Sequence, residues 1–173
     1  VVETAMRAGI KDIVTIVGHK REDVEAVLKD SVTYAYQEEL LGTGHTTMQA
    51  IPYLKDKKGK VVILYGDVPI VRPETLQKLI AKSIKEDNDA TVLTAMVPNP
   101  TGYGRIIRDE VGHVKEIVEE RDATEEQKKI SEINSGLYCF DIQELISALE
   151  KITPNNVQGE YYLTDVIKIM NEK

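Results

Sequence analysis

An acidic residue directly after the most apolar stretch of the chain is the first pattern that could do chemistry. Residues 61–65, Val-Val-Ile-Leu-Tyr, predict a buried strand and are followed by Gly66 and Asp67. In an open parallel sheet, ligands bind beyond the carboxyl ends of the strands, and a glycine there lets a ligand approach the backbone closely. Asp67 therefore offers an oxygen ligand suited to Mg²⁺ carrying substrate phosphates, with capping of a turn or helix as the alternative role.

A glycine-rich helix start forms a second pattern. Gln37 precedes the run Leu41-Gly42-Thr43-Gly44-His45. Backbone N–H groups at such a helix start suit a carbonyl- or phosphate-rich ligand, and a glutamine amide can donate and accept together, as recognition of a base edge requires. An ordinary glycine-rich turn is the alternative, and the lack of a following Gly-Lys-Ser/Thr excludes a Walker A loop.

Neutral polar groups in the second half of the chain suit a ligand such as a sugar. Asn134 lies within an apolar strand pattern, where a satisfied buried amide is the alternative. Residues 160–165, Glu-Tyr-Tyr-Leu-Thr-Asp, place aromatic rings and hydroxyls at a helix start, where capping and core packing explain them about as well. Taken singly, residues 100–105 are typical of a loop and residues 119–122 of a solvated charged turn.

Other kinds of chemistry find no support in the residue pattern. His19 and His113 have no partner at metal-ligand spacing, and no nucleophile–base pair is visible. Cys139 lies in a strand pattern, which favours a packed small hydrophobic role.

The elements that must position these residues alternate between strand and helix, which indicates a mostly parallel, doubly wound α/β sheet with helices on both faces. Residues 105–108 and 113–119 alternate in polarity around a turn and predict an added antiparallel hairpin. Pro52 is expected to end or kink a helix. We predict strands at residues 12–18, 31–36, 61–65, 90–97 and 133–140, and helices at residues 1–8, 21–28, 42–54, 73–85, 141–151 and 163–170.

Composition narrows the function classes. The 173 residues contain 22 basic and 29 acidic side chains, giving a formal net charge of −7, which argues against general nucleic-acid binding. No apolar run approaches the roughly 18 to 20 residues that span a bilayer, so we expect no membrane partner. A single cysteine favours a reducing compartment, and hence a cytoplasmic location. The length predicts one domain, or one domain with an appendage.

Taken together and in this order, the motifs resemble the pyrophosphorylase (uridylyltransferase) domain of the bifunctional bacterial enzymes that make UDP-N-acetylglucosamine. The resemblance covers essentially the whole chain, residues 1–173. It implies a Rossmann-like nucleotidyltransferase fold of the GT-A-like type. It also implies transfer of uridylyl from UTP to N-acetylglucosamine 1-phosphate with Mg²⁺, giving pyrophosphate and the cell-wall precursor UDP-N-acetylglucosamine. The matching stretches are residues 37–45, 65–69, 101–106, 117–124, 132–136 and 159–165.

The resemblance also implies a role for each site residue. Uracil would be held by Gln37, Gly42 and Thr43. The nucleotide and its phosphates would lie against Tyr65, Gly66 and Asp67, with Asp67 as the catalytic Mg²⁺ ligand. The acetylamino sugar would be surrounded by Gly104, Glu119, Asn134, Tyr162 and Thr164. The sugar phosphate would attack the α-phosphorus in line, so no protein nucleophile is required.

Two features of the family do not occur in this sequence. The family opens with a glycine-rich phosphate loop, Leu-Ala-Ala-Gly-x-Gly-Thr-Arg-Met, and has a second metal ligand, an asparagine, after a later strand. We therefore expect residues 1–173 to be part of a nucleotidyltransferase domain that lacks the phosphate-loop strand and has negligible turnover alone. Strand edges left unpaired are expected as well. The resemblance further implies a homotrimer formed through a C-terminal acetyltransferase domain.

Two other functions stay open from the sequence. One is a nucleotidyltransferase for another sugar phosphate or base. The stretch 159–165 argues against it, because this stretch matches the branch of the family that uses an acetylamino sugar. The other is a non-catalytic module that binds nucleotide sugars.

Overall fold

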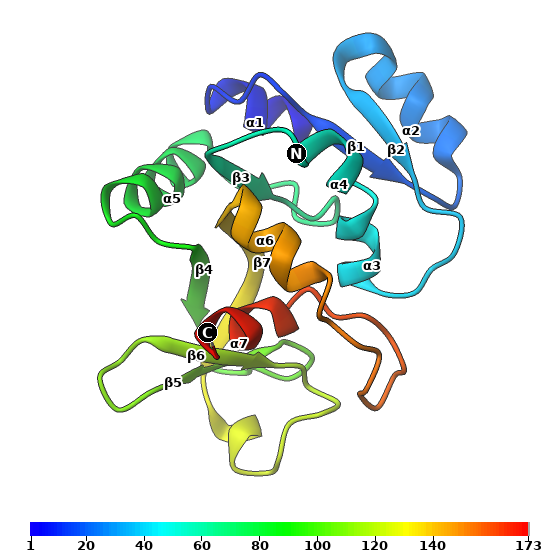
Figure 1. Cartoon of the computed structure of the whole chain (residues 1–173). Coiled ribbons are helices and arrows are strands. Elements are labelled where there is room, and N and C mark those ends of the chain that lie inside the picture. Colours follow the sequence, from blue (N-terminus) through cyan, green and yellow to red (C-terminus); the bar gives the residue numbers. More distant parts are fainter. Residues whose placement is uncertain (173) are drawn as a thin grey trace.

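The computed structural model describes residues 1–172, and strands and helices alternate through most of the chain (Figure 1). The helices are α1 (Val2–Arg7), α2 (Arg21–Leu28), α3 (Thr43–Met48), α4 (Ile51–Leu54), α5 (Pro73–Lys85), α6 (Ile142–Leu149) and α7 (Asp165–Asn171), with 3₁₀ turns η1 (Lys29–Ser31) and η2 (Gln127–Lys129). The strands are β1 (Val14–Val17), β2 (Thr33–Tyr36), β3 (Lys60–Ile63), β4 (Ala90–Met96), β5 (Arg105–Arg108), β6 (Val114–Val118) and β7 (Glu132–Asp141).

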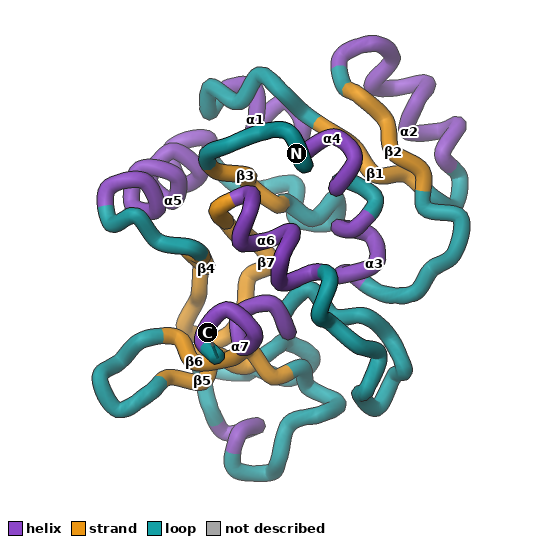
Figure 2. The backbone as a smooth tube through the Cα atoms, in the orientation of Figure 1, coloured by secondary structure: helices purple, strands orange, loops and turns teal. Residues whose placement is uncertain are grey.

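The strands form two sheets. Strands β1 and β2 pair in parallel, from Val14 opposite Thr33 to Val17 opposite Tyr36. In the larger sheet, the long strand β7 pairs antiparallel with β3, β4 and β5, and β6 extends the sheet beyond β5. Figure 2 shows the two groups of strands joined through loops and the short helices α3 and α4.

The α/β class is confirmed, but the expected mostly parallel pairing is wrong among the described residues. Only β1 and β2 pair in parallel there. The reason is the position of β7, which lies between β3 and β4 and runs opposite to both. Strands β3 and β4 therefore run in the same direction without pairing with each other, a placement that residue patterns within single strands do not reveal.

Helices cover both faces of the larger sheet, as predicted. The reason is that successive side chains of β7 point alternately to the two faces. Leu137 and Cys139 point to one face and pack with Leu76 and Leu79 of α5. The intervening residues Tyr138 and Phe140 pack on the other face in a core that includes α6 and α7. Successive side chains of a strand point to opposite faces, so one apolar strand supplies two cores. Cys139 is free and buried, which confirms its packing role.

The predicted hairpin is confirmed. Arg105 lies opposite Val118, and Ile106 opposite Ile117. Asp109 holds the turn, because its Oδ1 accepts hydrogen bonds from the backbone N–H groups of Val111 and His113 at 3.1 and 2.8 Å. Arg105, the first residue of the hairpin, lies between β6 and β7, opposite Val118 and Ile133.

The helix expected over residues 42–54 is two short helices, α3 and α4. Pro52 lies in the first positions of α4, where its missing N–H needs no partner, so it begins a helix rather than ending one. The break between α3 and α4 turns the chain from the first sheet toward β3.

The two sheets share one part of the core although their edges are not paired. Among residues 1–172, β1 pairs only with β2 and β3 only with β7, so one edge of each is unpaired, as expected. Ile16 of β1 and Val61 of β3 both pack against a cluster that contains Leu54 and Ile142. Apolar packing therefore joins the sheets where hydrogen bonds do not.

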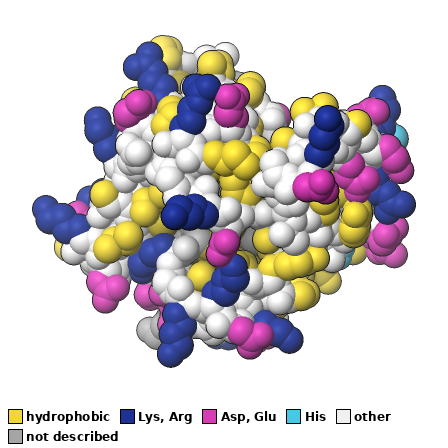
Figure 3. All heavy atoms as spheres, turned by 90° about the horizontal axis from the view of Figure 1, so that it is seen from above, with side chains coloured by type: hydrophobic (Ala, Val, Ile, Leu, Met, Phe, Trp, Pro, Cys, Tyr) yellow, Lys and Arg dark blue, Asp and Glu magenta, His cyan; other side chains and the backbone are white. Residues whose placement is uncertain are grey.

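The surface is mixed in character. Figure 3 shows hydrophobic side chains reaching the surface near the middle of the face seen from above, with charged side chains around them. A small apolar hollow is lined by residues that include Val1, Leu64, Val68 and Val71. No helix among the described residues has the length and hydrophobicity to cross a membrane.

Candidate functional site

Gln37 directly follows β2, and its amide is held in one orientation. Its backbone N–H donates to the carbonyl of Val17 at 2.9 Å, which continues the pairing with β1. Its Nε2 lies 3.1 Å from Nδ1 of His45, and its Oε1 accepts from the hydroxyl of Thr46 at 2.9 Å. The side chain is buried, so His45 and Thr46 orient an amide that keeps one free hydrogen and one free lone pair.

A hollow of about 380 Å³ lies at the carboxyl ends of β1 and β2, with Gln37 in its wall. Arg21 and Tyr36 also line it, and the guanidinium carbon of Arg21 lies 5.3 Å from the centre of the Tyr36 ring. Carboxyl ends of parallel strands are where α/β sheets bind ligands, and the volume is in the range of small-molecule sites.

The glycine-rich start of α3 contacts the segment that precedes α7. The N–H of Gly44 donates to the carbonyl of Tyr161 at 2.7 Å, and the N–H of Tyr161 donates to the carbonyl of Leu41 at 2.8 Å. The hydroxyl of Thr43 accepts from the N–H of Leu163 at 3.0 Å. Two sequence motifs far apart in the chain therefore form one wall.

Glycine is required at position 42 for this contact. Gly42 has φ of 104°, and a Cβ there would lie 2.6 Å from the carbonyl oxygen of Tyr161. A side chain would therefore meet both backbone strain and a steric clash.

Tyr65 connects this wall with the larger sheet. Gly136 makes room for it, because a Cβ at Gly136 would lie 2.7 Å from the Tyr65 ring. The ring meets that of Tyr138 edge to face, with centroids 6.2 Å apart. Burial raises the pKa of Tyr65, and hydrogen bonding to Tyr138 and Thr43 opposes that rise. The Tyr65 hydroxyl is therefore placed between the nucleotide motif and β7.

Asn134 continues the polar connection along β7. Its Nδ2 donates to the hydroxyl of Tyr138 at 2.5 Å, and its Oδ1 accepts from the N–H of Gly136 at 3.1 Å. Its own N–H donates to the carbonyl of Gly104 at 2.9 Å. Burial raises the pKa of Tyr138 well above its usual value, so the phenol stays protonated. Both polar atoms of the Asn134 side chain amide therefore have hydrogen-bond partners, and these partners fix its orientation.

Glu119 lies against Gly104 and Thr164. The hydroxyl of Thr164 donates to Glu119 Oε1 at 3.1 Å, and a Cβ at Gly104 would lie 3.3 Å from Oε2. Burial is the main cause that raises the pKa of Glu119, the charges of Asp165 and Asp122 raise it further, and the Thr164 hydrogen bond lowers it. The carboxyl group is therefore shielded from water and close to other acids, an environment suited to hydrogen bonds with a neutral ligand.

Tyr162 is buried beside these acids. Its hydroxyl accepts from Nε2 of Gln158 at 2.7 Å. Burial is the main cause that raises the pKa of Tyr162, and the charges of Asp122 and Glu119 raise it further. The structure thus brings together all five residues predicted to surround a sugar, namely Gly104, Glu119, Asn134, Tyr162 and Thr164.

Gly66 and Asp67 lie in an exposed turn after β3. The charge of Asp67 is among the causes that raise the pKa of Tyr65. Among the described residues, no group of three or more His, Cys, Asp or Glu side chains could hold a metal ion. A lone carboxylate fits Mg²⁺ when the remaining ligands are substrate phosphates and water, which is the usual arrangement for this ion.

Sequence reasoning missed the residues that orient the predicted ones. His45 was part of a motif but had no role, and its spacing from Gln37 signalled nothing. Tyr138 lies in an apolar strand pattern, where a tyrosine is easily interpreted as a core residue without a polar role. Only the fold shows that both hold the side chain amides of site residues.

The fold and the site define an α/β protein with a hollow at the carboxyl ends of two parallel strands and a group of buried polar side chains beside the larger sheet. The chain belongs to the nucleotidyl transferase family, whose family model matches residues 1–173.

Individual relatives narrow the comparison. The chain is 54% identical to the Bifunctional protein GlmU of Caldanaerobacter subterraneus subsp. tengcongensis over 170 residues, covering 98% of this chain and 37% of that protein. It is 50% identical to the protein of the same name from Acetivibrio thermocellus over 173 residues, covering 100% of this chain and 38% of that protein. The chain therefore spans well under half the length of these curated relatives.

Solved structures agree on the fold. The crystal structure of UDP-glucose pyrophosphorylase complexed with UDP-glucose aligns with a TM-score of 0.74 and 19% identity, covering 99% of this chain and 73% of that chain. The apo form of UDP-glucose pyrophosphorylase gives a TM-score of 0.74 at 17% identity, covering 99% of this chain and 74% of that chain.

Proposed function

We propose that these residues belong to an enzyme that transfers uridylyl from UTP to N-acetylglucosamine 1-phosphate, giving UDP-N-acetylglucosamine. The observation that carries the proposal is the hydrogen bond of 3.0 Å between the Thr43 hydroxyl and the N–H of Leu163. The bond lies between the glycine-rich motif at residues 41–45 and the segment that contains Tyr162 and Thr164, so it supports a single site formed by the two motifs. Identity of about half over the whole chain to proteins named Bifunctional protein GlmU supports the same activity.

The nucleotide half of the pocket would recognise and place UTP. The oriented amide of Gln37 would read the base edge, beside Gly42 and Thr43, and Tyr65 and Gly66 would line the path to the phosphates. Asp67 would hold Mg²⁺ together with phosphate oxygens, and the bound ion would stabilise charge on the phosphates.

The sugar half would bind N-acetylglucosamine 1-phosphate. Glu119 and Asn134 would contact hydroxyl and acetylamino groups, with Tyr162 and Thr164 completing the wall. Holding two substrates in line supplies much of the catalysis of such a transfer, so the described residues act by positioning.

Residues 1–173 hold a single predicted metal ligand and no glycine-rich phosphate loop of the family pattern. We propose that the chain alone binds its ligands with negligible turnover, since phosphate charge would be poorly compensated. Binding is therefore the measurement that tests the site.

Titration calorimetry with UDP-N-acetylglucosamine, UDP-glucose and UDP provides the test. We expect UDP-N-acetylglucosamine to bind at least about tenfold more tightly than UDP-glucose, because a site built to hydrogen-bond a group rejects the analogue that lacks it. Equal or tighter binding of UDP-glucose would contradict the sugar assignment and favour a nucleotidyltransferase for another sugar. Failure to bind any uridine nucleotide would contradict the proposed function altogether.

A further inference from the structure

Arg105 is a buried cation beside the sugar half of the candidate pocket. It is the first residue of β5, and its side chain is 1% exposed. Arginine is almost never fully buried unless it is paired, and a buried charge without a partner is strongly destabilising. A guanidinium retained in this position therefore points to a specific task.

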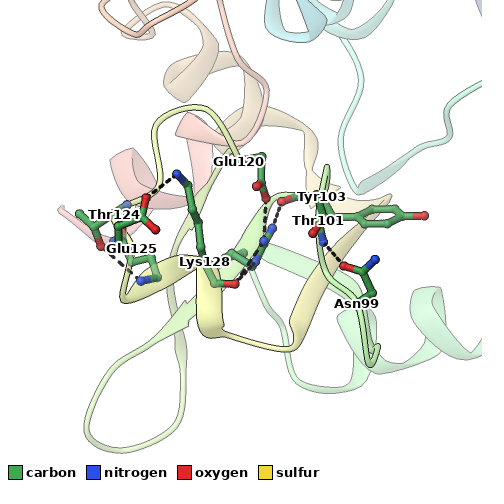
Figure 4. Close-up of polar contacts among 9 residues, drawn as sticks. Asn99, Thr101, Tyr103, Glu120, Thr124, Glu125 and Lys128 are labelled. Atoms are coloured by element: carbon green, nitrogen blue, oxygen red, sulfur yellow. Dashed lines mark hydrogen bonds and ion pairs between the residues drawn. The ribbon is translucent and has the colours of Figure 1, made fainter.

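The guanidinium of Arg105 joins three separate segments. Its Nη2 lies 2.6 Å from Oε2 of Glu120, in the loop after β6. Its Nε and Nη2 donate to the carbonyl of Lys128 in η2 at 3.4 and 3.3 Å, and its Nη1 donates to the carbonyl of Tyr103. Figure 4 shows Tyr103, Glu120 and Lys128 gathered around these hydrogen bonds. The planar fork of arginine suits three such acceptors, whereas lysine is a point charge.

The loop that Arg105 holds is itself well ordered by local contacts. The N–H of Thr124 donates to Oε1 of Gln127 at 2.9 Å, and the N–H of Gln127 donates to the Thr124 hydroxyl at 3.2 Å. These reciprocal bonds form a capping box, and Lys128 adds an ion pair with Glu125 at 2.8 Å. Arg105 therefore fastens a loop that is also held together by its own hydrogen bonds and ion pair.

This fastening lies next to the proposed sugar contacts. Arg105 follows Gly104, and Glu120 follows Glu119. Gly104 and the Glu119 carboxylate face each other, since a Cβ at Gly104 would lie 3.3 Å from Oε2. The ion pair between Arg105 and Glu120 therefore lies one residue along each segment from the contact between Gly104 and Glu119.

We propose that Arg105, through Glu120 and the carbonyl of Lys128, is a positioning residue that holds Glu119 at its place in the sugar half of the pocket. This inference rests on the proposed function, because it assigns the residue that sets the geometry of the same site. The energetic basis is that a loosened loop would let water reach Glu119 and would separate it from Thr164, which now donates to it at 3.1 Å.

Arg108 provides a matched control on the same strand. It makes an ion pair of 2.6 Å with Glu132. That pair joins β5 to β7 and involves no residue of the loop after β6. The substitution Arg108→Lys therefore perturbs an equally short pair in the hairpin without releasing Glu119.

A ligand-free experiment tests the positioning. Carboxyl ¹³C titration of Glu119 by NMR should give a pKa above the ordinary range in the wild type and in Arg108→Lys. In Arg105→Lys and Glu120→Gln, the pKa should move toward its ordinary value, because the carboxyl group becomes hydrated. An unchanged Glu119 titration in both folded variants would overturn the proposal. If Arg105→Lys does not fold, Glu120→Gln decides alone, since it removes the ion pair and leaves Arg105 itself in place.

Calorimetry then tests the consequence for binding. Arg105→Lys and Glu120→Gln should weaken UDP-N-acetylglucosamine binding about tenfold and leave UDP within about twofold, whereas Arg108→Lys should change neither. A parallel loss for both ligands, as a general loss of stability produces, would overturn the positioning role. A wild type that does not distinguish the two ligands would contradict the proposed function instead, and the Glu119 titration would still decide whether Arg105 positions that residue.

Discussion

Burial changes the chemistry of single residues at this site, and Glu119 shows how. In water a glutamate is a hydrated anion, but here desolvation raises the pKa of Glu119 and two neighbouring acids raise it further. The folded state therefore disfavours the charge that the unfolded chain carries at neutral pH. A residue kept in such a place weakens the fold, which is the pattern expected of a group retained for binding.

The substitution Glu119→Gln should raise stability at neutral pH. Because the folded pKa of Glu119 is raised, the contribution of this group to stability is fully present below the ordinary carboxyl range and is lost as pH rises through the folded pKa. Glutamine removes that loss and keeps an oxygen for Thr164, so Tm at pH 7 should rise by roughly 2–4 °C, about 1 kcal/mol.

Thermal unfolding across pH 4 to 8 measures this effect. The exposed Glu110→Gln is the matched control and should leave the pH profile of Tm unchanged. A Glu119→Gln profile parallel to that of the wild type would show that this carboxyl group does not titrate abnormally.

Among the elements, the loop into α3 depends on a backbone conformation that only glycine adopts easily. Gly42 combines positive φ with close approach to Tyr161. Helix α3 has six residues and no side-chain cap at its start, so contacts from the segment before α7 hold its first turn. The position of the glycine-rich motif at residues 41–45 therefore depends on an element at the other end of the sequence.

We expect Gly42→Ala to destabilise the protein more than Gly59→Ala. Both residues have φ near +100°, but a Cβ at Gly59 meets nothing within 4 Å, whereas one at Gly42 would clash with Tyr161. Gly59→Ala should cost about 1 kcal/mol from strain alone, and Gly42→Ala about 2 kcal/mol more. Urea unfolding of the two variants measures the difference, and equal losses would show that the contact with Tyr161 contributes nothing.

At the scale of the whole molecule, the two halves of the site are joined by few polar bonds. Residues before β3 supply the glycine-rich motif at residues 41–45, and residues after α6 supply the wall against which it rests. The bond from Leu163 to Thr43 and the hydrogen bonds around Tyr161 cross between them. Such a site forms only when the complete set of sheets and helices has assembled.

Removing the Thr43 hydroxyl should weaken this junction. Thr43→Val leaves the N–H of Leu163 without its acceptor, so unfolding free energy should fall by about 1–3 kcal/mol, and binding of UDP should weaken as well. The control Thr47→Val removes a hydroxyl that donates to a carbonyl within α3, so its effect should be smaller. Denaturant unfolding and calorimetry on both variants measure these effects, and equal stability of the two would contradict the role of the junction.

Elements with strong local signals were predicted well. The helices at 21–28 and 73–85 have the predicted bounds, the second because Pro73 can begin a helix and the polar residues after Lys85 end the pattern. The pairing of strands was predicted less well, because periodicity shows which faces are buried but not which strand lies next to which. The burial of Arg105 gave no sequence signal, since two of its partners, Glu120 and the carbonyl of Lys128, lie in other segments of the chain.

The sequence by itself determined the element types, the α/β class, the acidic charge and, by ordered motifs, the membership of the nucleotidyl transferase family. Those features depend on local composition and residue spacing, which are properties of the sequence and do not require the tertiary structure. Only the tertiary structure decided that β7 separates β3 from β4, that His45 and Tyr138 orient the amides of Gln37 and Asn134, and that the ion pair of Arg105 with Glu120 adjoins the contact between Gly104 and Glu119. These features arise from contacts between distant segments, and their energies are set by burial, which a linear sequence does not reveal.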